Sequence, residues 1–583
     1  MLGQDKPSYP VYAGLVMNKD FSFYIAIKYG KKMHVEKMVK KGPIKPQDVL
    51  DWLCDFSRNQ KIKFIGLGYA GIDRPESFGS ALWLKKDIVP YDFNHLKGKS
   101  KNKAKKIANR VSGDFDKKEN LVKINFDKDN RVRPAFLTSL KEYKKYDAPY
   151  FKELEKLAEE FKQRKLKVTF FNSTAAGGGV ALMRHALMRL YNLLGVNAEW
   201  YVTKSKGGAI FDITKRKIHN ILQGVAPAYV KLTEQDKEVY KKWTRENAKF
   251  FKKKFKESDV VVIDDPQPAG LIPYIKKENP SAKIIYRSHI QVEASLIDQK
   301  QEQQYITWSF IWSYAQQADL FVSHPIDKFV PQEVPRDKVV YMPATTDILD
   351  GLNKPLKFEQ KKHSFEVFNK ILRENGQTPL DLNRPYIIQI ARFDPSKGIP
   401  HVLDSYKKLY HKMIESGFPK AKIPQLVIAG NGAIDDPEGA PILSETLGFL
   451  TMDDYKDLAD DIKVTKLPHY DQILNTLLRE SKVVLQLSLK EGFEVKVTEA
   501  LAKGKPVIAY NTGGIPLQIR HGKSGYLVEP GNTTEVAERL YELFRDRNKY
   551  REMSDQAARL VRKDCFTVAN AYNWLRLAKQ LLD

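Results

Sequence analysis

From Lys167 onward, short apolar runs that suit buried strands alternate with longer amphipathic segments that suit helices. Such an alternation indicates parallel sheets covered by helices on both faces, because parallel neighbours need crossover connections. This many strands require two such sheets, so the sequence predicts an α/β fold with two Rossmann-like domains. The candidate strands lie at residues 260–263, 283–286, 320–323, 386–390, 425–429, 483–487 and 507–509.

The length of 583 residues also favours several domains, since a single hydrophobic core rarely grows so large. Residues 8–150 resemble a separate small α/β module. Its expected elements are strands at 11–17, 21–29 and 62–67 and a helix near 47–58.

The domain boundaries follow from these patterns. We expect an N-terminal α/β extension over 1–150, a first Rossmann-like domain over 151–375 and a second over 376–565. A charged helical segment at 149–164 leads into the first of the two large domains. The polar stretch 353–383 is expected to be an irregular connection between them.

The chain is basic, with 97 Lys and Arg against 71 Asp and Glu and a formal net charge of +26. Such a charge attracts phosphate-bearing partners, either small metabolites or nucleic acid. A lysine-dense segment is a candidate nucleic-acid patch, but no aromatic residues interleave it for base stacking, so a solvated loop or helix face is favoured. Its members are Lys97, Lys99, Lys101, Lys103, Lys105 and Lys106.

The two cysteines, Cys54 and Cys565, lie far apart in the sequence and lack metal-ligand spacing. This argues against a disulfide scaffold or a zinc site and fits a reducing compartment. The first residues lack the basic-then-apolar order of a signal peptide, and no apolar stretch reaches membrane-spanning length. We expect a cytoplasmic protein with no membrane partner and no bound metal.

Two glutamates, Glu491 and Glu499, are separated by seven residues. Glu491 leaves the apolar run 483–487 at the turn formed with Gly492, and Glu499 lies about one turn inside the next helix. The amides and the dipole at a helix N-terminus favour anions such as phosphate, and flanking carboxylates can accept hydrogen bonds from sugar hydroxyls. The pattern predicts a ligand that combines sugar and phosphate.

Arg392 and Lys397 follow the strand at 386–390 and are five residues apart across a turn punctuated by proline and glycine. Arginine can bind a phosphoryl group as a bidentate fork and lysine as a point charge. They could instead be ordinary surface charges, but their position after a buried strand, like that of Glu491, favours a phosphate clamp. Asn431, after the strand at 425–429, could border a nucleotide or a phosphate.

The first of the two large domains offers a second group of candidates. Gly177, Gly178 and Gly179 lie between a strand and a helix, where glycines allow the backbone to approach an anion; the run is not GxGxxG and could be only a tight turn. Polar side chains also follow two strands whose carboxyl ends should share one cleft. They are Asp265 and Gln267 after the first strand, and Arg287 and His289 after the second.

Arg392, Lys397, Glu491 and Glu499 together resemble the donor site of retaining glycosyltransferases with two facing Rossmann domains, in particular family 4. Further segments resemble the trehalose phosphorylase and trehalose synthase branch, with the fungal-type phosphorylases nearest. The resemblance extends from about residue 165 to 583, and the N-terminal extension has a looser analogy in those phosphorylases. The matching segments are 177–185, 219–224, 265–267, 287–290 and 342–347.

The resemblance implies a GT-B fold in which a final helix, 566–583, returns to the first domain, and it implies no metal and no cofactor. Arg392 and Lys397 would hold the donor phosphate. Glu491 and the amides of Gly492 and Phe493 would hold glucose hydroxyls. His289 and the Gly177–Gly179 loop would face the sugar, with Glu499 on a nucleotide ribose.

The activity that the resemblance implies is glucosyl transfer with retention, by reversible phosphorolysis of α,α-trehalose to α-glucose 1-phosphate and glucose. A trehalose synthase using a nucleoside-diphosphate glucose is the alternative, and Glu499 favours it because a phosphorylase has no ribose to bind. Partners are then small sugars with phosphate or a sugar nucleotide, and homo-oligomerisation stays open. A nucleic-acid-binding protein and a pseudo-enzyme on the same scaffold rank well below.

Overall fold

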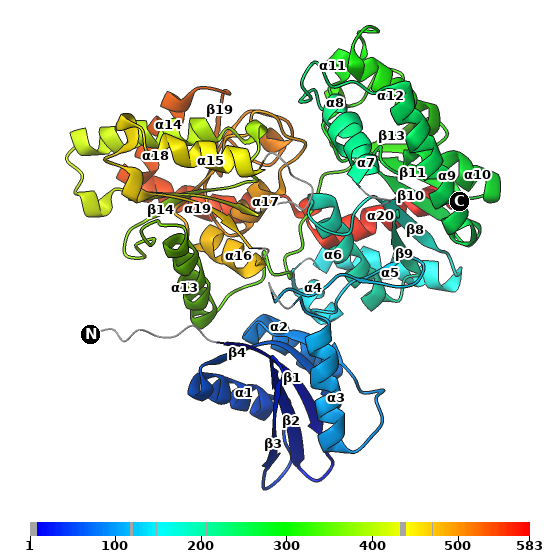
Figure 1. Cartoon of the computed structure of the whole chain (residues 1–583), viewed down its shortest axis with the longest axis vertical. Coiled ribbons are helices and arrows are strands. Elements are labelled where there is room, and N and C mark those ends of the chain that lie inside the picture. Colours follow the sequence, from blue (N-terminus) through cyan, green and yellow to red (C-terminus); the bar gives the residue numbers. More distant parts are fainter. Residues whose placement is uncertain (1–8, 117–119, 147, 205–207, 432–438, 469) are drawn as a thin grey trace.

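The computed structural model describes residues 9–116, 120–146, 148–204, 208–431, 439–468 and 470–583. The chain forms a small N-terminal domain beside two larger α/β domains that face each other (Figure 1). The two parallel six-stranded sheets confirm the predicted pair of Rossmann-like domains. Among the described helices, none has the length and apolar character that crossing a bilayer demands.

The N-terminal domain is built on a five-stranded mixed sheet in the order β3-β2-β1-β4-β5. Helix α3 covers one face so closely that a Cβ on Gly14 would lie 2.2 Å from the Ala104 carbonyl oxygen. Lys97 and Lys99 of the lysine-dense segment precede α3, and Lys101, Lys103, Lys105 and Lys106 lie in it. Ala104 and Ile107 are buried and Lys101 is exposed, as a solvated helix face requires. The elements are β1 (Tyr9–Met17), β2 (Ser22–Tyr29), β3 (Lys32–Val39), α1 (Pro46–Gln60), β4 (Ile62–Ala70), α2 (Pro75–Lys86), β5 (Val89–Asp92) and α3 (Ser100–Gly113).

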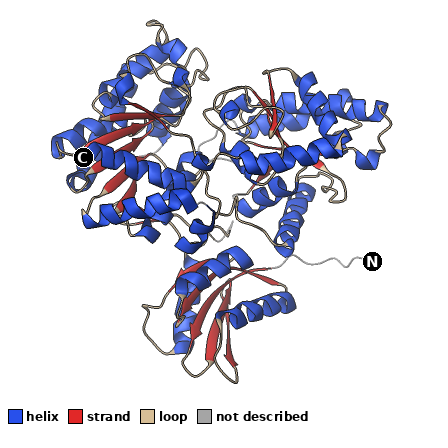
Figure 2. Ribbon diagram, turned by 180° about the vertical axis from the view of Figure 1, so that it is seen from behind, coloured by secondary structure: helices blue, strands red, loops and turns tan. Residues whose placement is uncertain are grey.

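The first Rossmann-like domain has the strand order β13-β12-β11-β10-β8-β9, all parallel. Figure 2 shows its helices on both sides of the strands. Its strands are β8 (Val168–Asn172), β9 (Ala198–Val202), β10 (Val260–Asp264), β11 (Lys283–Arg287), β12 (Leu320–Ser323) and β13 (Val339–Tyr341). Its main helices are α5 (Ala148–Gln163), α6 (Gly179–Leu194), α9 (Glu234–Lys256), α10 (Ile272–Glu278) and α12 (Gln303–Ala315), with a π-helix at Asp212–His219.

The last helix, α20 (Thr567–Leu582), belongs to the core of the first domain although it follows the second domain in sequence. The Trp574 ring meets Phe170 of β8 edge-on at 5.6 Å, and the Tyr191 hydroxyl donates to the Ala571 carbonyl at 2.8 Å. These contacts bury the apolar stripe of α20 against α5, α6 and the sheet.

The second Rossmann-like domain has the strand order β16-β15-β14-β17-β18-β19, again all parallel. Its strands are β14 (Tyr386–Ile390), β15 (Gln425–Asn431), β16 (Ile462–Leu467), β17 (Val483–Gln486), β18 (Val507–Tyr510) and β19 (Gly525–Val528). Its helices include α13 (Phe358–Glu374), α14 (Ile399–Glu415), α15 (Gly439–Phe449), α16 (Asp471–Glu480), α17 (Val495–Ala502), α18 (Thr533–Arg545) and α19 (Arg547–Leu560).

The prediction of an irregular connection is wrong over Phe358–Glu374, which is helix α13. Phe365, Phe368 and Leu372 recur at three- and four-residue spacing and pack into the second domain. The apolar stripe is short and the residues around it are mostly charged or polar, so the sequence of this segment resembles that of a loop.

The N-terminal domain meets both larger domains through the end of α2. The Asp87 carboxylate lies 2.5 Å from Lys354 Nζ in the connection and accepts from Gln472 Nε2 of α16 at 2.8 Å. Lys63 Nζ lies 3.0 Å from the other oxygen of Asp87. The Trp83 indole donates to the Leu349 carbonyl at 2.8 Å. We call this set of contacts the Asp87 junction.

Candidate functional site

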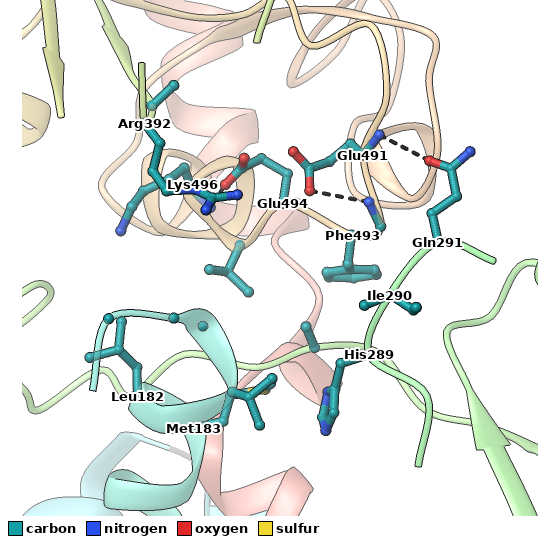
Figure 3. A pocket seen from close by; sticks show the side chains of 18 of the residues that line it. Leu182, Met183, His289, Ile290, Gln291, Arg392, Glu491, Phe493, Glu494 and Lys496 are labelled. Carbon is teal, nitrogen blue, oxygen red and sulfur yellow. Dashed lines mark hydrogen bonds between the residues drawn. The ribbon is translucent and has the colours of Figure 1, made fainter. Parts of the chain in front are cut away.

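A cavity of about 440 Å³ lies between the two Rossmann-like domains, outside the carboxyl ends of both sheets (Figure 3). Ligands of open α/β sheets bind in such a position. Both domains contribute candidates that the sequence singled out. They are Gly177, Gly178, Gly179, Asp265 and His289 from the first domain, and Arg392, Lys397, Glu491, Gly492 and Phe493 from the second.

A smaller chamber of about 130 Å³ extends from the main cavity into the first domain. The two share Gly178, Val180, Lys215, His219 and Asp265 in their walls. Gln267 lines the small chamber, and its Oε1 is buried without a hydrogen-bond partner among the described residues. A buried acceptor of this kind is expected to find a donor on a ligand.

The second-domain wall is built around Lys397, which a tight turn presents after β14. The Asp394 carboxylate accepts from the Ser396 amide at 2.8 Å. Gly398 has φ +60, and a Cβ there would lie 2.1 Å from the Leu487 carbonyl oxygen, so this position requires glycine. The Lys397 ammonium pairs with the Glu491 carboxylate. Arg392 Nη2 stays near the cavity mouth, 3.7 Å from Asp394 Oδ2, and its side chain is 40% exposed.

The charges of this wall stabilise one another. Burial alone would lower the pKa of Lys397, but Glu491 and Glu494 outweigh it and raise that pKa, so the ammonium is charged at neutral pH. Burial would conversely raise the pKa of Glu491, and Lys397 pulls it below the ordinary value. An ionised Glu491 is ready to accept from a hydroxyl group of a ligand.

The loop that carries Glu491 also touches the first domain. The Glu491 amide donates to Gln291 Oε1 at 3.1 Å, as Figure 3 shows. Phe493 stacks on His324 with the ring centroids 5.7 Å apart. The Gly492 amide donates to the Glu491 carboxylate at 3.1 Å. The two domains are therefore in contact along one side of the cavity, which places sugar-binding candidates of both within reach of one small ligand.

The first-domain wall is organised by a buried ion pair. Arg184 binds the Asp264 carboxylate through two hydrogen bonds of 2.7 and 2.6 Å. The other partner of Asp264 is His289 Nε2, at 2.9 Å. Burial is the largest cause that lowers the pKa of His289, so its ring is neutral at pH 7 and donates through Nε2–H.

Asp265 completes this wall. Its Oδ1 accepts from the His289 amide at 2.7 Å, and its backbone has φ 68, in the left-handed region. Burial raises the pKa of Asp265, more than the nearby His289 and Arg287 lower it. The Asp265 carboxyl lines both chambers, next to the space where the two meet.

Two sequence candidates, Arg287 and Glu499, lie outside the cavity wall. Arg287 is buried behind His289, donates to the Ser323 carbonyl at 2.8 Å and has its Nε 3.4 Å from His289 Nδ1. Glu499 is buried on α17, where it accepts from Thr346 Oγ1 at 2.8 Å and from Lys496 Nζ at 2.7 Å. Asn431 ends β15, one residue after the lining residue Gly430.

The cavity also contains residues that sequence reasoning did not select as site residues. From the first domain come Lys215 and His219 of the π-helix, with Lys215 Nζ 3.0 Å from His219 Nε2. From the second domain come Glu494 and Lys496. Glu494 and Lys496 stand inside the segment between the paired glutamates, and His219 begins the matching segment 219–224, so both signals were present in the sequence. Lys215 lies outside the matching segments and had no such signal.

The cavity wall combines positive charge with hydrogen-bonding groups. Arg392, Lys397 and Lys496 offer positive charge that would suit a phosphoryl group, and Glu491, Asp265 and the glycine loop offer groups that would suit hydroxyls. No group of three or more His, Cys, Asp or Glu residues in the described ranges could hold a metal ion.

Two facing Rossmann-like domains with this polar cavity between them define a GT-B glycosyltransferase. Residues 170–331 match the family described as "Trehalose synthase, N-terminal domain", and residues 371–560 match "Glycosyl transferases group 1". The chain belongs to this glycosyltransferase family, in the branch that contains trehalose synthases and trehalose phosphorylases.

Several similar proteins are named as enzymes that make or cleave trehalose or its phosphate. A trehalose phosphorylase of Pleurotus pulmonarius is 46% identical over 435 residues, which cover 73% of this chain and 58% of that protein. A trehalose synthase of Pyrococcus horikoshii is 35% identical over 74% of this chain and 94% of that protein. A solved trehalose-phosphate synthase of Burkholderia xenovorans, 12% identical, has the same fold, with a TM-score of 0.53 over 71% of this chain and 100% of that one.

Proposed function

We propose that this chain catalyses retaining glucosyl transfer on α,α-trehalose, by reversible phosphorolysis to α-glucose 1-phosphate and glucose. The chain spans 58% of the length of the Pleurotus relative, so the proposal depends on the cavity residues as well as on the relatives. The same residues support small sugars and phosphate as the partners, and the unpaired Cys54 and Cys565 support the cytoplasm as the compartment.

The observation that carries the choice of donor is the position of Glu499. A nucleotide sugar brings a ribose whose hydroxyls need an acceptor, but Glu499 is not part of the cavity wall, and its two oxygens are engaged by Thr346 and Lys496. Lys397 and Arg392 instead face space that a single phosphoryl group can occupy. This arrangement supports inorganic phosphate rather than a nucleotide.

The proposed reaction proceeds on one face of the sugar. A phosphate oxygen attacks C1 of one glucosyl unit as the C1–O bond to the second glucose breaks, through an oxocarbenium-like state. The phosphate proton moves to the departing glucose oxygen, so no separate protein acid is required. Arg392 and Lys397 stabilise the phosphate charge, an effect worth about 3–4 kcal/mol for each well-placed donor.

The first-domain wall would hold the departing glucose. The small chamber contains Gln267 and Asp265, whose acceptor atoms suit sugar hydroxyls. His289 is neutral and fixed by Asp264, so its role is to shape and orient the wall next to the reacting sugar.

The alternative is a trehalose synthase that uses a nucleoside-diphosphate glucose, which the identity to the Pyrococcus protein favours. One experiment separates the two. Purified protein is incubated with trehalose and phosphate, and separately with glucose and UDP-, ADP- or GDP-glucose, and the products are identified. Glucose 1-phosphate formed only in the first reaction is the expected result; trehalose formed only in the second would overturn the proposal.

A further inference from the structure

Glu494 has a backbone conformation that its residue type disfavours. Its φ of 64 and ψ of 81 lie in the left-handed region, and it stands at the N-cap of α17. A non-glycine residue held in a sparsely populated region costs on the order of 1–3 kcal/mol and persists only where its surroundings enforce it. Gln518 Nε2 enforces it here, by donating to the carbonyl oxygens of Phe493 at 2.6 Å and Glu494 at 3.3 Å.

Glycine would suit this backbone conformation better, so the contacts of the Glu494 carboxylate indicate what the side chain contributes. Oε1 accepts from the Lys496 amide at 3.2 Å, and Oε2 lies 3.5 Å from Lys397 Nζ and accepts from Gln486 Nε2 at 3.3 Å. Figure 3 shows Glu494 beside Glu491 on the same wall of the cavity. The carboxylate thus occupies a place where a helix N-terminus and an ammonium group both attract anions.

A carboxylate in this place distinguishes anions by their protons. Inorganic phosphate keeps an O–H at neutral pH and can donate it to a carboxylate. The diphosphate of a sugar nucleotide has no such proton, so each of its oxygens is an acceptor and meets the carboxylate with like charge. The penalty is large in a buried site because neither group retains water.

We propose that Glu494 determines donor specificity, by accepting a hydrogen bond from a protonated phosphate bound at Lys397 and by repelling the ionised diphosphate of a nucleotide sugar. This inference rests on the proposed phosphorolysis and assigns it a selecting residue. In the reverse direction, the attacking glucose hydroxyl gives its proton to the departing phosphate, which then carries the O–H that Glu494 accepts. Burial and the neighbouring charge of Glu491 raise the pKa of Glu494 to about 7, so the ionised form that this selection requires prevails above that pH.

The test compares phosphate with sulfate, which has the same shape but no proton at neutral pH. Binding of each anion to the full-length protein is measured by calorimetry. A hydrogen bond to a charged group contributes about 1.5–3 kcal/mol, so the wild type should prefer phosphate at least about tenfold. In Glu494→Gln, whose amide donates to either anion, the preference should fall close to onefold.

Two further variants make the result specific. Glu494→Gly suits the left-handed backbone and removes the charge, so it should fold normally and bind UDP-glucose more tightly than the wild type. Glu293→Gln changes a carboxylate that contacts Lys490 at the domain boundary, at 3.4 Å, and should leave the phosphate preference unchanged.

An unchanged phosphate preference in folded Glu494→Gln, or a wild type that binds sulfate as tightly as phosphate, would overturn the assignment of Glu494. The proposed function fails on a different result, namely wild-type turnover with a nucleotide sugar and none with phosphate.

Discussion

At the scale of single residues, Lys397 stands out because its charge is already balanced by Glu491 and Glu494 before any ligand binds. An arriving phosphate must therefore compete for the ammonium, while Arg392, whose nearest carboxylate is 3.7 Å away, is more readily available. The two cations should therefore contribute differently. Lys397 should act mainly in the chemical step, whereas Arg392 should act both in that step and in the initial binding of the anion.

Replacing either cation with alanine should therefore remove most turnover. Loss of one donor to the phosphate is expected to lower kcat by about 10²–10³-fold. Arg392→Lys should recover only part of this loss, because the ammonium lacks the bidentate fork. Initial rates of phosphorolysis measure the effect, and circular dichroism checks the fold. Wild-type rates in a folded Lys397→Ala protein would refute the phosphate clamp.

Glu499 gives a prediction of stability with a defined pH dependence. Burial would raise its pKa, but Lys496 and Lys503 outweigh it and hold the pKa below the ordinary value. The ionised form is thus favoured by folding, and this stabilisation is complete above the unfolded pKa of about 4.3 and is lost as the pH falls through the folded value.

Glu499→Gln should consequently lower the free energy of unfolding by about 1–3 kcal/mol at pH 7, and the difference from the wild type should shrink in acid. Thermal unfolding between neutral and acidic pH measures this. The affinity for UDP should stay the same, because Glu499 lies outside the cavity wall. A selective loss of UDP binding would show instead that Glu499 turns toward a ribose.

At the scale of elements, the loop after β18 packs directly against the backbone of the loop that carries Glu491. Gly513 has φ +55, and a Cβ there would lie 1.8 Å from the Glu491 carbonyl oxygen. No side chain fits without moving the backbone that presents Glu491. Two loops from neighbouring strands thus fix one carboxylate.

Gly513→Ala should reduce both stability and turnover. Gly531→Ala is the matched control, because Gly531 also has a positive φ, +90, but a Cβ there meets nothing within 4 Å. The control should lose only about 1 kcal/mol for the unfavourable φ, with normal turnover. Urea unfolding and kcat measure the contrast. Equal effects of the two substitutions would mean that the close approach to Glu491 is unimportant.

The sequence predicted these elements well where one physical signal dominates. Strands such as Val260–Asp264 and Tyr386–Ile390 are buried on both faces, so they read as continuous apolar runs, and the turns after them located Arg392, Lys397 and Glu491. It could not show that Glu499 faces Thr346, because that contact joins residues 153 positions apart. Nor could it show the left-handed backbone of Glu494, since nothing in the residue type indicates a positive φ.

At the scale of the whole molecule, the Asp87 junction links the N-terminal domain to the connection and to the second Rossmann-like domain. Burial would raise the pKa of Asp87, but Lys354 and Lys63 outweigh it and hold the pKa well below the ordinary value. The N-terminal domain therefore contacts the connection between the two larger domains.

Asp87→Asn leaves the buried Lys354 ammonium without its carboxylate, which should destabilise the protein by about 3–5 kcal/mol. Adding Lys354→Met should restore part of that loss, and the two substitutions should be non-additive. Thermal unfolding of the single and double variants measures the coupling. Additive effects would contradict a direct role for the pair. A change in KM for trehalose in Asp87→Asn would link the junction to opening of the cavity.

The placement of α20 has a consequence for how the molecule is made. Its Trp574 completes the core around Phe170, yet it leaves the ribosome only after the entire second domain has been synthesised. Until then the apolar residues of α5 and α6 that α20 covers in the folded protein remain exposed to solvent. During that interval the exposed apolar surface favours aggregation of the nascent chain, until α20 completes the core of the first domain.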